Sequence, residues 1–267
     1  MRLFVSHKTQ YDFAIAPHYG LQQLRLTPKS RLGHTVEDWI VDIDGGKVEA
    51  EFTDFNNNFT QLVRLHEGVY SLKITCQGNL DITANDGVLG AHEGFTPLWY
   101  FSRSTELTMP GPHIQNLLKP FSTDPDNPLD SLHKLSAHIV ARVAYRLGST
   151  GPDTTADMAA GLSQGVCQDH AHIFISCARE LGFPARYVSG YLMMDDREEQ
   201  DATHAWAEAW VEGLGWVGFD VSNQISPNEK YVRIASGLDY SEAAPISGVT
   251  YGDTGETVKV ELRVQQQ

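Results

Sequence analysis

Cysteine is scarce in this sequence, with three residues among 267. Cys76, Cys167 and Cys177 are too few and too scattered for a disulfide framework, and their odd number leaves at least one thiol free. Long apolar runs are also missing, since none approaches the ~20 residues that span a bilayer. The first residues lack the apolar core and cleavage site of a signal peptide. We therefore expect a protein of the reducing cytoplasm that makes no membrane contact.

Positive charge is also in short supply. Lys and Arg total 20 against 34 Asp and Glu, which gives a formal net charge of −14. Such a surface repels phosphate backbones, so we expect no nucleic-acid partner. No acidic calcium loop of the DxDxDG kind is present, and we expect neither a metal nor another cofactor. The 41% hydrophobic content is ample for one globular unit or two fused ones.

The first part of the chain has the period of two that strands produce, and residues 1–110 are predicted to form a β-sandwich-like domain. Turn formers such as Asn56-Asn57-Asn58 divide its runs. The segment from Thr108 to Pro128 is rich in Pro and turn residues, so we place a domain boundary there and assign residues 111–267 to a second domain. Strands are predicted at 34–43, 47–55, 59–66 and 69–76.

Beyond the boundary the apolar period changes to three and four, which indicates helices. One helix is predicted from the stripe Leu132, Leu135, Ile139, Val143 and Leu147, with Gly148 as its stop. A second helix is predicted from Cys167 to Leu181 and ends at Gly182 and Pro184. Residues 195–201 are predicted to form a solvated acidic loop. Strand-like runs follow at 185–193, 204–211 and 216–221, and the last two flank a hairpin turn at 212–215.

Cys167 stands at the predicted start of the second helix, where free N–H groups and the helix dipole favour thiolate over thiol. A thiol nucleophile needs a base, and His204 opens the strand His204-Ala205-Trp206. Asp220 ends the neighbouring strand, where a carboxylate would fix the imidazole tautomer and stabilise its protonated form. Cys76 and Cys177 fit a small buried hydrophobe better.

The spacing between His204 and Asp220 is 220 − 204 = 16, an even number that lets both side chains share a sheet face. An ideal hairpin centred on Leu214 would nevertheless place Asp220 opposite Glu208, ~13 Å along the strand from His204. We therefore predict an irregular hairpin, with a shifted register or a bulge near residues 212–215. Otherwise a different group would have to orient the histidine.

Three sequence runs resemble the core of the transglutaminase-like superfamily, in the expected order: GVCQDHAHIF, RELGFPARYVSGYL and HAWAEAWVEGLGWVGFD. The tail, with IASGLDY and APISG, resembles bacterial members that carry an amino-terminal β domain. The resemblance implies an α+β fold with a papain-like core, the nucleophile at a helix amino terminus and the other two residues on adjacent antiparallel strands. It implies that Cys167 is the nucleophile, His204 the general base and then acid, and Asp220 the orienting carboxylate. Many relatives have Pro-Thr after the aspartate, where this chain has Val221-Ser222.

The oxyanion of a tetrahedral intermediate needs donors, and we name the backbone N–H of Cys167 and the side chain of Gln164 as candidates. Gln164 is equally well explained as a solvated loop residue. Asp169 and His170 are assigned to helix-start electrostatics or structure.

The favoured function is hydrolysis of peptide or isopeptide bonds through a thioester, on a peptide or protein substrate. An amine acceptor would make the protein a transglutaminase instead. The residues also allow a zinc site built from Cys167, His170, His172 and His204, and they allow a catalytically silent binding module.

Overall fold

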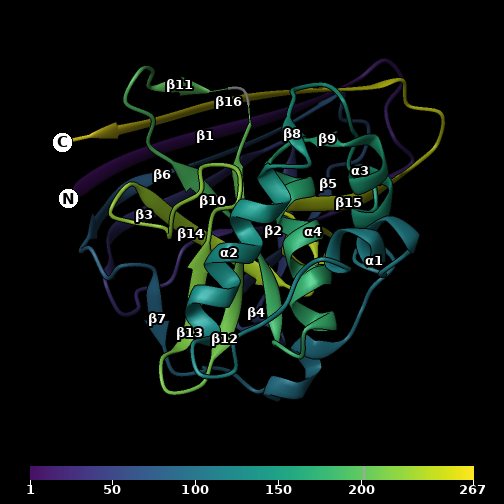
Figure 1. Ribbon diagram of the computed structural model, residues 1–267. Helices are drawn as coiled ribbons and strands as arrows, with labels where there is room; N and C mark the ends of the chain where they lie inside the picture. Colours follow the sequence, from purple (N-terminus) through teal and green to yellow (C-terminus); the bar gives the residue numbers. More distant parts are fainter. Residues whose placement is uncertain (201) are drawn as a thin grey trace.

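The computed structural model describes residues 1–200 and 202–267 and has a mixed α+β fold (Figure 1). Two antiparallel sheets form a β-sandwich from strands that are distant in sequence. The first has the order β11 (Glu199–Gln200), β16 (Glu256–Gln266), β1 (Arg2–Phe13), β6 (Ser71–Ile82) and β3 (His34–Asp44). The second has the order β15 (Ile246–Tyr251), β2 (Tyr19–Thr27), β5 (Phe59–Leu65) and β4 (Gly46–Thr53).

Strand β6 illustrates why these segments form a sandwich. Its buried and outward residues alternate along its whole length, and Leu72, Ile74 and Cys76 all point into the interior. They pack there against Leu24 of β2 and Val63 of β5, so the two sheets meet face to face. The predicted strands from 34 to 76 and the sandwich-like region are therefore confirmed.

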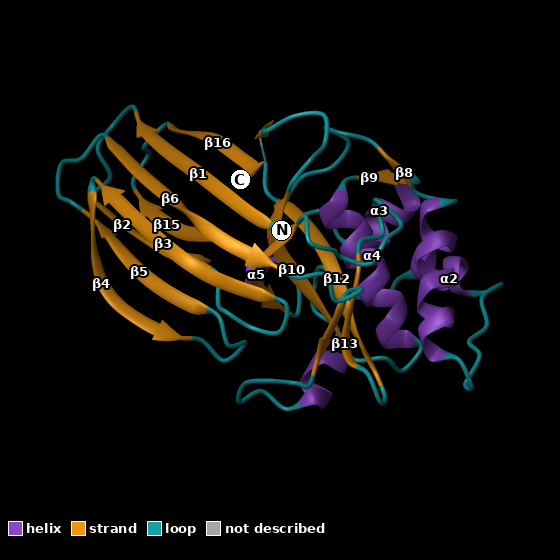
Figure 2. Cartoon of the chain, turned by 90° about the vertical axis from the view of Figure 1, so that its left-hand side faces the viewer, coloured by secondary structure: helices purple, strands orange, loops and turns teal. Residues whose placement is uncertain are grey.

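The end of the chain returns to the amino-terminal sheets. Strand β15 pairs with β2, and β16 pairs with β1 along nearly its whole length. The N–H of Gln267 donates to the carbonyl of Arg2, and the two termini lie side by side (Figure 2). The sheets thus do not follow a linear division of the chain at residue 110.

A third sheet lies between the sandwich and the helices (Figure 2). One of its faces packs on helix residues such as Phe174, and the other meets Leu3 and Val5 of β1 through Tyr191 and Val232. Because both faces are covered, every residue of the strands β10, β13 and β14 is buried. The strand order is β14 (Tyr231–Gly237), β10 (Ala185–Leu192), β12 (His204–Val211), β13 (Gly215–Phe219) and β7 (Val88–Gly90).

Helix α4 covers the outer face of this third sheet and packs directly on β12 and β10. A short parallel pair of strands, β8 (Ala144–Tyr145) and β9 (Gln164–Gly165), leads into α4. The helices are η1 (Leu98–Ser102, a 3₁₀-helix), α1 (Pro112–Leu118), α2 (Pro128–Val140), α3 (Ala156–Leu162), α4 (Cys167–Glu180) and α5 (Tyr240–Ala243).

The predicted extension of α2 through Val143 to Leu147 is wrong. The N–H of Val143 still bonds the carbonyl of Ile139, but Ala144 then pairs with Gln164 in the β8–β9 bridge and leaves the helical path. Leu147 is 78% exposed, so it takes no part in the apolar stripe.

The predicted solvated loop at 195–201 is only partly observed. Glu199 and Gln200 form β11 on the edge of the sandwich, and the Gln200 side chain donates to the carbonyl of Leu192 at 2.8 Å. Asp201 lies outside the described residues.

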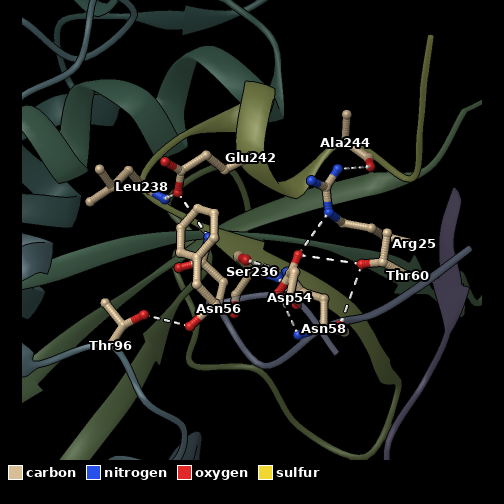
Figure 3. Close-up of polar contacts among 11 residues, drawn as sticks. Arg25, Asp54, Asn56, Asn58, Thr60, Thr96, Ser236, Leu238, Glu242 and Ala244 are labelled. Atoms are coloured by element: carbon tan, nitrogen blue, oxygen red, sulfur yellow. Dashed lines mark hydrogen bonds and ion pairs between the residues drawn. The ribbon is translucent and has the colours of Figure 1, made fainter. Parts of the chain in front are cut away.

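A loop of the sandwich docks onto the third sheet and fixes the relative position of the two parts (Figure 3). Asn58, between β4 and β5, makes a reciprocal pair with the backbone of Ser236 on β14. Its amide donates to the Ser236 carbonyl at 2.8 Å and its oxygen accepts from the Ser236 N–H at 2.9 Å. Asp54 of the same loop pairs with Arg25 at 3.1 Å, and Arg25 reaches the carbonyl of Ala244. All these groups are buried, so breaking the junction would leave polar groups without partners.

Candidate active site

Cys167 is the first residue of α4, as predicted, and its side chain is partly exposed. The helix begins here because the Asp169 carboxylate turns back and accepts from the N–H of Val166 at 2.7 Å. Thr150 donates to the same carboxylate oxygen at 2.6 Å. Gly165 makes room for this contact, since a Cβ at that position would lie 2.6 Å from the Cβ of Asp169. Asp169 therefore has a structural role at the helix start, as the sequence suggested.

His204 is the first residue of β12, and its imidazole stacks on the buried Trp206 ring at a centroid distance of 6.3 Å. Its Nε2 lies 2.6 Å from Oδ2 of Asp220. The side chain of His204 is 10% exposed and that of Asp220 is 1% exposed, so the contact is almost removed from solvent. The structure thus brings together the histidine and the aspartate that the sequence singled out.

The hairpin that joins the two residues explains how they meet. Strands β12 and β13 pair without a bulge, but Glu208 lies opposite Gly218 and not opposite Asp220. The register is thus shifted by two residues from the ideal hairpin centred on Leu214. On this register Asp220 falls level with Trp206, only two residues or ~7 Å from His204, which a diagonal pair of side chains can span. The predicted register shift is confirmed, while no bulge is needed.

Asp220 is held by two groups that the sequence analysis did not name. Tyr231 on β14 donates its hydroxyl to Oδ2 of Asp220 at 2.7 Å, and the Asn223 amide donates to the same oxygen at 2.7 Å. The backbone N–H of Asn223 also donates to Oδ1, at 3.2 Å, in a turn of the kind that Asp readily forms. The spacing of Asp220 and Asn223 was a local signal for this turn. Tyr231 gave no such signal, because it lies on β14, and only the long-range pairing of strands in the third sheet places β14 near Asp220.

Electrostatics at this pair favour an imidazolium. Burial lowers the pKa of His204, but hydrogen bonds to Asp220 and Cys167 and the negative charges of both outweigh it and raise that pKa to about 10. Burial raises the pKa of Asp220, and this effect is outweighed by His204 and by the donors Asn223 and Tyr231, so the pKa falls below its usual range. Both groups are therefore charged at neutral pH.

The sulfur of Cys167 is the remaining member of the cluster. Its effect on His204 is that of a hydrogen-bonding partner and a negative charge. Cys167 also affects the pKa of Tyr145, a half-exposed residue on β8. Burial raises this pKa, and the charges of Cys167 and Asp220 raise it further. Cys167 and Asp220 thus both act on His204, and the three side chains form one electrostatic cluster.

The titration of His204 should depend on Asp220. In the wild-type protein we expect the imidazole to stay charged up to about pH 10. This charge contributes stability that is complete below the unfolded value of 6.5 and is lost as pH rises toward 10. In Asp220→Asn the main charge partner is gone while burial remains, so we expect a neutral imidazole at pH 7. NMR titration of the histidine ring protons, with His204→Gln to assign the signal, measures this midpoint. An unchanged midpoint in Asp220→Asn would disprove the coupling.

Gln164 lies on β9, three residues before Cys167. Its side-chain oxygen accepts from Arg146 Nη1 at 3.2 Å, which leaves the amide N–H groups as the available donors. No measured contact joins Gln164 to Cys167 within the described part of the chain, so its part in an oxyanion hole stays a prediction.

The other histidines of α4 have structural partners. His170 is within hydrogen-bonding distance of the Ser222 hydroxyl at 2.9 Å and the Val143 carbonyl at 3.0 Å, so both its ring nitrogens are engaged. His172 is fully buried and accepts from the N–H of Tyr240 at 3.1 Å. Over residues 1–200 and 202–267, no group of three His, Cys, Asp or Glu side chains is arranged to hold a metal ion. Nor does any helix in that part of the chain have the length and apolar character to cross a membrane.

Known proteins share these features. Residues 115–221 match the family model described as the transglutaminase-like superfamily, and residues 3–81 match the bacterial transglutaminase-like N-terminal region. A protein of Mycobacterium tuberculosis described as uncharacterized is 28% identical over 285 residues, which cover 96% of this chain and 90% of that protein. A protein-glutamine gamma-glutamyltransferase of Pseudomonas aeruginosa is 30% identical over 118 residues, 39% of this chain and 17% of that enzyme.

A crystal structure of a candidate cysteine protease from Cytophaga hutchinsonii has the same fold. It superposes with a TM-score of 0.77 at 21% identity and covers 100% of this chain and 91% of its own. The expected α+β fold with an amino-terminal β region is thereby confirmed. The two family models account for the core that holds Cys167, His204 and Asp220 and for the sandwich before it. This chain therefore belongs to the transglutaminase-like superfamily and carries the amino-terminal region of its bacterial members.

Proposed function

We propose that this protein is an enzyme that hydrolyses peptide or isopeptide bonds, with Cys167 as nucleophile, His204 as proton carrier and Asp220 as orienting carboxylate. The observation that carries the proposal is the 2.6 Å contact of His204 with Asp220, beside a helix that begins with Cys167. Desolvating both groups of a buried, charged pair costs free energy, so the presence of such a pair calls for a functional reason. Activation of a neighbouring thiol supplies that reason.

The chemistry begins with attack of the Cys167 thiolate on the carbonyl carbon of the scissile amide. A C–S bond forms, and the carbonyl oxygen becomes an oxyanion. The backbone N–H of Cys167 has no intrahelical acceptor at the first helical position and can donate to that oxygen, with the Gln164 amide as a second candidate. When the intermediate collapses, the C–N bond breaks and His204 gives its proton to the leaving amine.

Water then completes the cycle. Neutral His204 takes a proton from water, the oxygen attacks the thioester carbon, and the C–S bond breaks to release a carboxylic acid and regenerate the thiolate. The Asp220 carboxylate keeps the imidazole in one orientation throughout, and Asn223 and Tyr231 hold that carboxylate. An amine in place of water would give transamidation by the same steps. That is the second candidate function, and the similarity to the gamma-glutamyltransferase favours keeping it.

Product analysis separates hydrolysis from transamidation. The protein is incubated with a peptide library that contains glutamine side chains and isopeptide bonds, with and without a primary amine. The products are then identified by mass spectrometry. We expect new carboxylates from cleaved amides in both conditions. Amine adducts on glutamine would identify the transglutaminase, and absence of any covalent change would favour the catalytically silent module.

The three cysteines should differ strongly in reactivity. Cys76 and Cys177 are both 0% exposed. Burial raises the pKa of the Cys76 thiol to about 12 and that of Cys177 still higher. Cys167 is accessible and faces an imidazolium, so iodoacetamide should modify it at least ~100-fold faster at pH 6.5. Peptide mapping after timed alkylation of the native protein gives the three rates. Equal rates would contradict the assignment of Cys167.

A further inference from the structure

A second cluster of charged groups lies where the sandwich meets the third sheet. Glu208 on β12 is completely buried and pairs with Arg186 on β10 at 2.5 Å and Arg233 on β14 at 2.9 Å. The guanidinium of Arg186 also lies 3.9 Å from the centroid of the Trp216 ring. This triad by itself could be a structural element that fixes three neighbouring strands.

Arg31 from the sandwich adds a third guanidinium to the cluster. A tight turn presents it together with His34: the N–H of Arg31 donates to the carbonyl of His34 at 2.8 Å, and the N–H of His34 donates back at 3.0 Å. Burial lowers the pKa of Arg31 to about 9, and Arg233 acts in the same direction, but the group stays charged at neutral pH. Among the described residues no carboxylate lies within ion-pair distance of Arg31, so a purely structural explanation leaves it without a partner.

This cluster therefore carries a net positive charge. Three guanidiniums face one buried carboxylate, that of Glu208, and one exposed carboxylate, that of Glu93, at the edge of the cavity. Burying an excess cation costs free energy unless an anion balances its charge.

Unpartnered polar atoms converge on the same place. Within the described residues, Nε of Arg31 and both ring nitrogens of His34 are buried without a hydrogen-bond partner, and His34 is only 6% exposed. The side-chain oxygen of Asn56 is also buried without a partner. Burial lowers the pKa of His34 to about 4, so its neutral ring can still donate one N–H. Native structures seldom leave so many such groups unsatisfied at one site.

These groups line two adjoining cavities. One is lined by Arg31, Arg186 and Arg233 together with Asn56, Asn57 and Glu93. The other is lined by Arg31, His34 and Arg233 and reaches Trp206 and Tyr231, which contact His204 and Asp220. Asn56 belongs to the docked loop of Figure 3, where its amide donates to Glu242 at 2.9 Å. The cavities thus lie at the junction of the two parts of the molecule, behind the candidate active site.

We propose that this junction binds a small oxyanion, a phosphate or a carboxylate, through the guanidiniums of Arg31, Arg186 and Arg233. Guanidinium forks match the planar and tetrahedral oxygens of these anions, and the bound charge would balance the excess cation. Because Arg31 comes from the sandwich while Arg186 and Arg233 come from the third sheet, the anion would bridge the two parts. It would therefore stabilise the folded protein. This inference does not depend on the reaction proposed for Cys167.

Calorimetric titration and thermal unfolding of the whole protein test the site. Inorganic phosphate and acetate are added in separate arms, with sodium chloride used to hold ionic strength constant. We expect measurable heat and a rise in Tm in at least one arm, and the arm that responds identifies the anion. In Arg31→Gln we expect binding to weaken by at least about tenfold, because this variant loses the guanidinium of the cluster that pairs with no carboxylate among the described residues. Arg142→Gln is the matched control, since Arg142 is exposed just after α2 and lines neither cavity, and it should bind as the wild type does.

A second variant protects the test against a folding defect. His34→Phe removes the unpartnered ring nitrogens and keeps every charge, and it should weaken binding several-fold. Heat and Tm that do not respond to either anion in the wild-type protein would overturn the proposal. So would wild-type affinity in both Arg31→Gln and His34→Phe.

Discussion

Replacing Cys167 with alanine is expected to abolish amide turnover, with kcat at least ~10⁴-fold lower than in the wild-type protein. The sulfur attacks the amide and then carries the acyl group in the proposed cycle, and no neighbouring side chain can take its place. The substitution is small and its site is partly exposed, so stability should change little. Activity is measured on an amide that the wild-type protein cleaves, with circular dichroism as the check on folding.

The controls for this prediction lie in the same chain. Cys76→Ala removes a buried thiol of the sandwich and should leave kcat unchanged. His204→Ala should come close to Cys167→Ala. Asp220→Ala should retain more activity, because the carboxylate orients the base and is not consumed. Full activity in Cys167→Ala, or a greater loss in Cys76→Ala, would require a different nucleophile.

Replacing Glu208 with glutamine should destabilise the protein by about 3–5 kcal/mol, because it leaves two buried guanidiniums without their carboxylate. Burial raises the pKa of Glu208, but Arg186 and Arg233 outweigh it and lower that pKa to about 2. The charged form thus contributes stability above the ordinary value of 4.5, and this contribution is lost as pH falls toward 2. Urea unfolding monitored by tryptophan fluorescence at pH 7 gives the free energy of unfolding.

Glu49→Gln is the matched control for this substitution. Glu49 also pairs with an arginine, Arg64, at 2.9 Å, but the two side chains are 37% and 45% exposed. Solvent screens an exposed pair of this kind, so it contributes little to stability and the midpoint in urea should scarcely move. Equal and small effects of Glu208→Gln and Glu49→Gln would show that the buried triad does not hold the third sheet together.

The sequence was sufficient to predict which residues meet at the candidate active site, because the position of each has a local cause. Cys167 lies just after a glycine and a valine at a helix start, and the apolar spacing behind it is that of α4. His204 and Asp220 are joined by a hairpin, so their separation is governed by one turn. The exact register could not be derived from the sequence, because the length of the turn decides which residues of the two strands lie opposite each other.

Long-range contacts are where sequence patterns gave no guidance. Tyr231 reaches Asp220 because β14 and β13 belong to the same sheet, and the pairing of β16 with β1 joins opposite ends of the chain. Val143 kept the helical spacing but lies beyond the end of α2, because the β8–β9 bridge draws the chain away. The sequence analysis did not single out Arg31, and the fold places it near Arg233. Each of these depends on tertiary packing and not on local preference.

The covalent intermediate offers the most direct test of the proposed role of Cys167. Wild-type protein is mixed with an activated acyl substrate such as p-nitrophenyl acetate, quenched in acid within the first turnover and measured by intact-mass spectrometry, followed by peptide mapping. We predict a mass increase of one acyl group on the peptide that contains Cys167, labile to hydroxylamine, and absent from Cys167→Ala. Turnover without any acylated Cys167 peptide, or an acyl group on another residue, would contradict this role.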